Sequence, residues 1–205
     1  LHSTSRRQRQ MCIRDRDKQS KQVSLMDLKG VKFEQSYRLT SPLNVSSTYA
    51  SGDFERLHPS TVYKLTNSEE NKLGLPMPSG VVRFYDKDGS GELQFIGAAD
   101  MAQLAKGEKA ELAIGEAFDI YADGKITAQN KLSEKMAENE VSVTFHNAKG
   151  RDAAVEFVQT FYYQTEIVSE SLPSDRSKAR TFKWLVNVPA GGETTLTYKV
   201  RVTYN

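Results

Sequence analysis

The chain has 205 residues, and its 28 Lys and Arg against 26 Asp and Glu give a formal net charge of +2 at pH 7. It holds one cysteine, and no apolar run approaches the roughly 20 residues that a membrane-spanning helix needs. The sequence therefore excludes a disulfide framework and a transmembrane helix, and its length suffices for one large or two small domains with a genuine core.

Residues 1–16 differ in kind from the rest of the chain. Arg6–Arg16 match, codon by codon, the translation of a transposase-adapter oligonucleotide used to prepare DNA sequencing libraries. We therefore treat 1–16 as a non-native, adapter-derived leader, and we expect the native N-terminus to be missing.

Removing the leader changes the charge and the available chemistry. The leader carries five Arg and one Asp, so 23 basic and 25 acidic residues remain and the net charge becomes −2. The basic character that would suggest a nucleic-acid partner disappears. Cys12 is removed as well, which excludes a thiolate metal site and a cysteine nucleophile from the remainder.

Beyond residue 30 the hydrophobic pattern mostly has a period of two, which is typical of β-strands. Strands are predicted, in chain order, at residues 31–39, 62–67, 81–85, 93–96, 110–114, 118–121, 141–145, 155–168, 182–188 and 194–204. The runs 81–85 and 93–96 flank a turn-rich stretch and predict a β-hairpin.

A few segments predict other local structure. Ala98–Lys106 and, more weakly, Lys131–Ala137 have helical spacing, but neither is long enough to organise a helical layer. Asp123-Gly124 is a turn signal, and turns are also predicted at 146–150 and 189–193.

The last predicted strand has the clearest alternation. Its apolar residues are expected to point into the core: Leu196, Tyr198, Val200 and Val202. Its polar residues are expected to face water: Thr195, Thr197, Lys199, Arg201 and Thr203. This pattern is typical of an antiparallel sheet with one wet face.

Many short strands separated by turns predict an all-β protein, an antiparallel β-sandwich whose C-terminal part is Ig-like. We divide the chain into the leader at 1–16, a β-rich segment at 17–117 and an Ig-like β-sandwich at 118–205. An incomplete domain is one interpretation of the middle segment.

The strongest local motif is Asp86–Glu92, with the sequence DKDGSGE. It resembles the opening of a calcium loop, which needs oxygen ligands at alternate positions and a glycine at a sharp turn. The closing position holds Gly97 where a bidentate Glu should complete the coordination. A hairpin turn explains the same residues, because Asp and Gly tolerate positive φ, and we favour the turn.

Other candidate sites have structural explanations. Glu116 and Asp119 could form a hydrolase pair, but solvated strand-edge charges are favoured. His58 and His146 have no predicted partner and are interpreted as exposed turn residues. The sequence thus assigns no catalytic, cofactor-binding or metal-binding residue.

The aromatic residues of the C-terminal third could form a platform for carbohydrate, although a core position is favoured. They are Phe157, Phe161, Tyr162, Tyr163 and Trp184. Asn44-Val45-Ser46 is a formal glycosylation acceptor of little specificity.

Residues 75–205 resemble the C-terminal uncharacterised domain of mucoidy-inhibitor-A-like bacterial proteins. The resemblance is carried by the segments 75–85 (LPMPSGVVRFY), 93–97, 107–108, 115–119 and 188–200. One departure is Gln103-Leu104-Ala105, where family members often have His-Thr, so no role for that His is carried over. The resemblance implies an all-β domain on secreted or envelope proteins, preceded by a coiled-coil and β-rich portion. It implies no catalytic residues, and the family name points to exopolysaccharide regulation.

These observations predict a non-catalytic, extracytoplasmic β-sandwich module with a structural or interaction role. We expect a protein or polysaccharide partner, no nucleic acid, no membrane span in this fragment and no cofactor. The alternatives are a carbohydrate-active hydrolase and a calcium-dependent carbohydrate- or surface-binding module.

Overall fold

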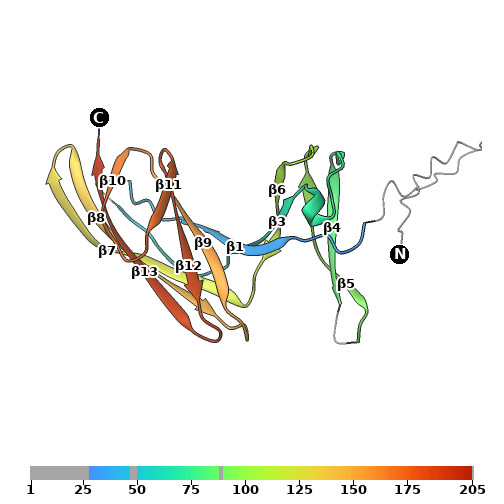
Figure 1. Cartoon of the computed structure of the whole chain (residues 1–205). Helices are drawn as coiled ribbons and strands as arrows, with labels where there is room; N and C mark the ends of the chain where they lie inside the picture. The colour runs from blue at the N-terminus through green and yellow to red at the C-terminus, as the bar shows by residue number, and fades with distance from the viewer. Residues whose placement is uncertain (1–27, 47–49, 88–89, 205) are drawn as a thin grey trace, which may run out of the picture.

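The computed structural model describes residues 28–46, 50–87 and 90–204, and this part of the chain is nearly all β (Figure 1). The leader at 1–16 lies outside the described residues. A short 3-10 helix, η1 (Glu69–Asn71), follows the third strand. No helix in the described ranges has the length and hydrophobicity to cross a membrane. The strands are β1 (Glu34–Thr40), β2 (Asp53–Leu57), β3 (Ser60–Thr66), β4 (Gly80–Lys87), β5 (Leu93–Met101), β6 (Lys109–Glu116), β7 (Ile120–Ser133), β8 (Met136–Asn147), β9 (Ala153–Thr160), β10 (Gln164–Glu170), β11 (Ser174–Lys178), β12 (Thr181–Val188) and β13 (Glu193–Thr203).

Two sheets pack face to face, and the predicted all-β sandwich is confirmed. One sheet has the order β11-β12-β9-β1-β3-β6 and the other β10-β13-β8-β7-β2. Strands from both sides of Phe118 are hydrogen-bonded in these sheets: β1, β3 and β6 in the first and β2 in the second. Pairing is antiparallel except between β1 and β9, which run parallel with Tyr37 opposite Val155.

A third, two-stranded sheet of β4 and β5 stands at the end of the molecule away from β10 and β11 (Figure 1). It forms the predicted hairpin, with Val81 opposite Asp100 and Tyr85 opposite Phe95. β3 and β6 extend beyond the sandwich to support it, and the ring of Phe84 stacks on that of Tyr63 at 4.8 Å.

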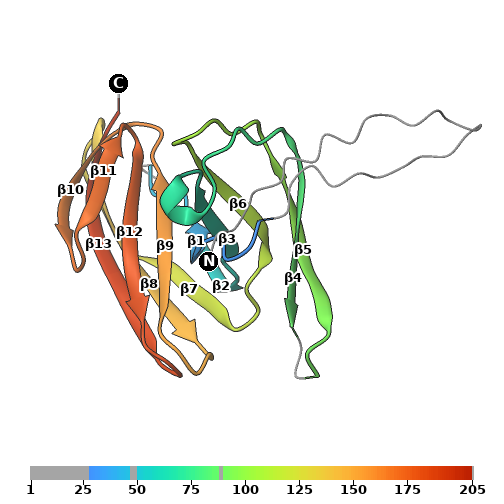
Figure 2. The same cartoon turned by 45° about the vertical axis from the view of Figure 1, so that its right-hand side comes forward.

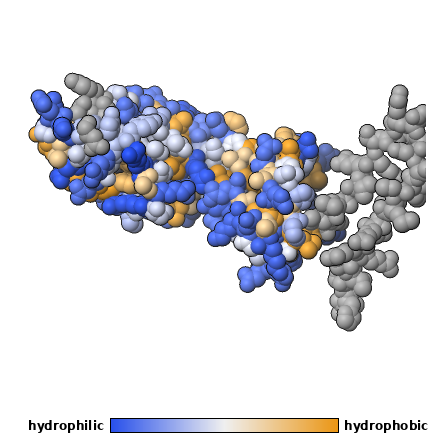
Figure 3. Space-filling view, turned by 90° about the horizontal axis from the view of Figure 1, so that it is seen from above, coloured by the Kyte–Doolittle hydropathy of each residue, from blue (hydrophilic) through white to orange (hydrophobic). Residues whose placement is uncertain are grey.

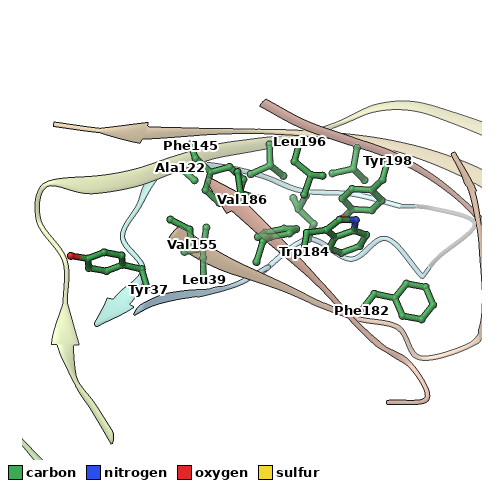
Figure 4. Packing of buried hydrophobic residues seen from close by; sticks show 14 of the residues in the cluster. Tyr37, Leu39, Ala122, Phe145, Val155, Phe182, Trp184, Val186, Leu196 and Tyr198 are labelled. Atoms are coloured by element: carbon green, nitrogen blue, oxygen red, sulfur yellow. The ribbon is translucent and has the colours of Figure 1, made fainter. Parts of the chain in front are cut away.

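The core of the sandwich is built around aromatic side chains, as the sequence predicted (Figure 4). Trp184 is fully buried, stacks on Tyr198 at 4.7 Å and lies 5.9 Å from Phe157. Phe161 is buried as well, so the core interpretation is confirmed for these rings. Tyr162 and Tyr163 are instead exposed, because the chain leaves one sheet after β9 and enters the other at β10.

The alternation along β13 is confirmed. Leu196, Tyr198, Val200 and Val202 are all buried, with exposed fractions of 2% or less. Thr195 and Thr197 are exposed, whereas Lys199 and Arg201 are half-buried against carboxylates of the neighbouring strands.

Val200 and Arg201 provide a paired test of this register. Val200→Ala should lower the free energy of unfolding by on the order of 1–3 kcal/mol, through lost burial and an incompletely collapsed cavity. Arg201→Ala should cost no more than about 1 kcal/mol, because its ion pair with Glu138 is partly exposed. Paired urea denaturation curves measure both values, and an equal or larger loss at Arg201 would contradict the observed register.

Three sequence predictions of local structure are wrong. Ala98–Lys106 is not helical, because its first residues continue β5 and pair with β4. Lys131–Ala137 contains the β7–β8 turn, where the long ladder between these strands overrides helical propensity. Asp123-Gly124 lies inside β7 rather than in a turn. Gly124 is needed there because a Cβ would come within 2.4 Å of the Phe54 ring.

The predicted long strand 155–168 is also two strands. β9 ends at Thr160 in the six-stranded sheet, and β10 begins at Gln164 in the five-stranded sheet. An apolar period alone does not reveal such a change of sheet, because both strands bury side chains in the same core.

Candidate functional site

The outer face of the five-stranded sheet carries a regular set of polar side chains, which we call the polar grid. Three strands contribute three residues each, and the ladders place them in three rows across the sheet. The grid consists of Tyr121, Asp123 and Lys125 on β7, Ser142, Thr144 and His146 on β8, and Glu193, Thr195 and Thr197 on β13.

His146 is held between two carboxylates at one end of the grid. Its Nε2 lies 3.0 Å from Asp123 Oδ2, and its Nδ1 lies 3.3 Å from Glu193 Oε2. Its ring stacks on Tyr121 at 4.6 Å with an interplanar angle of 16°. His146 is therefore not the exposed turn residue that the sequence suggested. It belongs to β8, and cross-strand pairing supplies partners that are distant in sequence.

A β-bulge brings Arg56 to the same end of the grid. β2 bulges between Phe54 and Leu57, and Arg56 adopts a φ of 47°, a conformation that costs a residue with a side chain about 1–3 kcal/mol. Its backbone N–H donates to Asp123 Oδ1 at 2.7 Å, and its guanidinium carbon lies 4.7 Å from the centre of the Tyr121 ring. Asp123 thus joins the bulge to His146.

The middle of the grid is a floor of four short hydroxyl side chains, Ser142, Thr144, Thr195 and Thr197. Thr144 Oγ1 and Thr195 Oγ1 lie 3.0 Å apart and form a hydrogen bond. Each hydroxyl can both donate and accept, so this floor can match either kind of group on a ligand.

Two shallow grooves meet on this floor. The first, of about 580 Å³, runs along the β2 bulge and includes Asp123 and His146. The second, of about 590 Å³, lies toward β10 and includes Glu140 and Lys199. Ser142 lines both grooves, which therefore adjoin at this residue, and we call the pair the polar channel.

Several of the charges around the channel are paired with one another. Lys199 Nζ lies 2.6 Å from Glu140 Oε1. The hydrogen bond to Glu140, together with the attraction between the two opposite charges, raises the pKa of Lys199. Arg201 donates twice to Glu138, at 2.7 and 3.0 Å. A surface whose charges neutralise each other favours a ligand with many hydrogen-bonding groups over one with a strong net charge.

The Asp86–Glu92 motif lies where β4 leads into β5, and Asp86 and Lys87 are the last residues of β4, paired with Gln94 and Leu93. The hairpin between the two strands is confirmed, but its first strand extends two residues further than the sequence predicted. Asp86 Oδ1 accepts a hydrogen bond from the backbone N–H of Lys87 at 2.8 Å. Asp88 and Gly89 lie outside the described residues. Among the residues that are described, no group of three His, Cys, Asp or Glu side chains could hold a metal ion.

The other sequence candidates lie away from the channel. Glu116 ends β6, Asp119 Oδ2 lies 3.6 Å from Lys149 Nζ, and neither residue lines the two grooves. His58 was expected to be exposed, but it is half-buried. Its Nδ1 donates to the carbonyls of Ala117 and Ile120 at 3.1 and 2.9 Å and closes the turn before β7.

The formal glycosylation acceptor lies at the edge of the core. Asn44 is exposed, Val45 is fully buried, and the hydroxyl of Ser46 accepts a hydrogen bond from the backbone N–H of Tyr162 at 3.0 Å. These residues therefore anchor the loop after β1 to the sandwich.

Sequence reasoning missed the polar grid because it assigned Asp123 to a turn and His146 to a loop. The available signal was polar alternation, with Tyr121, Asp123 and Lys125 in one strand and Ser142, Thr144 and His146 in the next.

No family model, curated protein or solved structure matches the chain.

Proposed function

We propose that this chain is a non-catalytic, extracytoplasmic β-sandwich module, Ig-like in its C-terminal part, that binds a polysaccharide strand along the polar channel. The observation that carries the proposal is the pair of adjoining grooves that share Ser142 and are also lined by Thr144 and Thr197. Its extracytoplasmic setting rests on the resemblance to mucoidy-inhibitor-A-like proteins, whose name points to the same class of polymer.

The chemistry of the channel supports a polyhydroxylated ligand. Sugar hydroxyls donate and accept hydrogen bonds, as do the side chains of Ser142, Thr144, Thr195 and Thr197. Two adjoining grooves suit an extended chain better than a compact molecule, and groups fixed in strands need little ordering when a ligand binds.

The pairing of the ionisable groups supports a binding role rather than hydrolysis. Asp123 is engaged by His146 and by the Arg56 N–H, and Glu193 is engaged by the same imidazole. A glycosidase needs one carboxyl group as acid and a second across the scissile bond. Here both carboxylates serve to position His146.

Isothermal titration calorimetry with soluble polymers tests the proposal. The probes are a neutral β-glucan, a neutral α-glucan and alginate as the polyuronate. We expect one of the neutral glucans to bind. Thr144→Val, in the first groove, combined with Thr197→Val, in the second, should weaken binding about tenfold or more, because two hydrogen bonds worth about 1 kcal/mol each are removed with little change of shape.

Thr160→Val is the matched control, because Thr160 is exposed on the opposite sheet. It should leave binding unchanged. Failure of all three polymers to bind, or binding that is unaffected by the double substitution, would overturn the proposal. Release of reducing ends from a bound glucan would establish the hydrolase alternative instead.

A further inference from the structure

The β4–β5 hairpin has one face on the protein, and no other described strand lies over its opposite face (Figure 2). On the inner face, Phe84 stacks on Tyr63, and Gly97 packs directly against the backbone of Ile114. The opposite face begins with Val81 and Tyr85, which are each more than half exposed. The hairpin therefore has a supported inner face and an uncovered outer face among the described residues.

The outer face is unusually apolar for a solvent-facing sheet. Leu93 is 68% exposed and Phe95 58%, and the ring of Phe95 meets that of Tyr85 edge-on at 5.6 Å. With Val81 they form a row along the hairpin, and Figure 3 shows apolar surface at this end of the molecule. Contiguous exposed apolar side chains of this size mark interaction surfaces.

Charges on the outer face are separated along its length. Lys87, which is opposite Leu93, lies at the turn, and Asp100, which is opposite Val81, lies at the base. Arg83, which is opposite Ala98, lies between the base and the aromatic pair. None of these three side chains takes part in an ion pair within the described residues. A partner that fits this face must therefore be largely apolar, with an acidic group over Lys87 at the turn and a basic group over Asp100 at the base.

A second copy of the same face, rotated by a two-fold axis, has this arrangement. We propose that the outer faces of two β4–β5 hairpins pack antiparallel and form a homodimer. The base of one hairpin then lies over the turn end of the other, so Asp100 of each copy approaches Lys87 of its mate. Tyr85 and Phe95 from both copies fill the centre, as the self-complementarity of a two-fold interface requires.

The area of the outer face determines how tightly the two copies are expected to bind each other. Exposed side chains of this size can each bury on the order of 100 Å² more, so four of them per copy bury about 800 Å² in total, which is the size of a weak, transient interface. We therefore expect a weak dimer, with a dissociation constant of roughly 100 µM or above.

Sedimentation equilibrium of the full chain tests the inference, over roughly 1 µM to 1 mM and with reductant so that Cys12 cannot form cross-links. Wild-type protein should pass from monomer to dimer across this range. Tyr85→Ser with Phe95→Ser should remain monomeric at every concentration. Leu185→Ser is the matched control, because Leu185 is 62% exposed on β12 at the other end of the protein, and it should dimerise like the wild type.

A charge exchange tests the antiparallel arrangement separately. Lys87→Asp and Asp100→Lys should each weaken the dimer several-fold, and the two together should restore it. Leu93→Ser supplies a second apolar variant if the double serine variant loses its native circular dichroism spectrum. A wild-type monomer at the highest concentration, a dimer that survives the hairpin substitutions, or a charge exchange without rescue would overturn the inference.

Discussion

Replacing Trp184 with alanine is expected to lower the free energy of unfolding by about 3–5 kcal/mol. The indole is fully buried between the sheets and contacts Phe157 and Tyr198. Its Nε1–H also donates to Glu170 Oε2 at 2.9 Å. Alanine would leave a large cavity and remove one partner of a carboxylate whose side chain is only 16% exposed.

Urea denaturation of the alanine variant measures this loss, and Leu185→Ala is its control. Leu185 is the next residue along β12, but its side chain faces solvent, so its substitution should change stability by less than about 0.5 kcal/mol. Trp184→Phe separates packing from hydrogen bonding, because phenylalanine fills part of the cavity without the donor. A loss below about 1 kcal/mol for Trp184→Ala would show that the sandwich does not depend on this residue.

The network around Glu170 explains how a carboxylate is tolerated beside this core. Burial alone would raise the pKa of Glu170, but hydrogen bonds from Ser174, Trp184 and Arg176 outweigh it and the pKa is lowered. The charged form is thus favoured in the folded protein. Arg38 and Glu156 form a similar pair on the six-stranded sheet, where their hydrogen bond offsets the burial of both groups.

The C-terminal core was predictable because its signal is local. β13 alternates apolar and polar residues over its whole length, and a slip of one residue would move Lys199 and Arg201 into the core. The hairpin of β4 and β5 was predictable for the same reason, since two strands and their turn are adjacent in sequence.

The polar grid was not predictable, because it depends on the register of three strands. Asp123 and His146 come together only when β7 and β8 pair, and Glu193 joins them only when β13 is added. The parallel pairing of β1 with β9 is equally non-local, because it joins residues more than 100 positions apart. The turn predicted at Asp123-Gly124 is absent because this glycine lies inside β7, where it packs closely against the Phe54 ring.

Gly97→Val is expected to detach the β4–β5 hairpin from the sandwich. A Cβ at this position would lie 2.3 Å from the carbonyl oxygen of Ile114 and 3.0 Å from its Cβ. Because the obstructing atom belongs to the backbone of β6, no side-chain rotation relieves the clash, and β5 must move away. We expect a loss of about 3 kcal/mol in the stability of the hairpin, at the upper end of typical overpacking costs.

Hydrogen exchange measured by mass spectrometry locates this loss. Peptides from β4 and β5 should lose protection in the Gly97→Val variant, whereas peptides from β8 and β13 should keep it, because the core of the sandwich contains no residue of the hairpin. Gly80→Val is the matched control on β4, since a Cβ at Gly80 meets no atom within 4 Å. It should leave protection in the hairpin unchanged. Equal protection in the Gly97 and Gly80 variants would show that the hairpin does not rest on β6, and a loss of protection that includes β8 and β13 would show that the hairpin and the sandwich unfold as one unit.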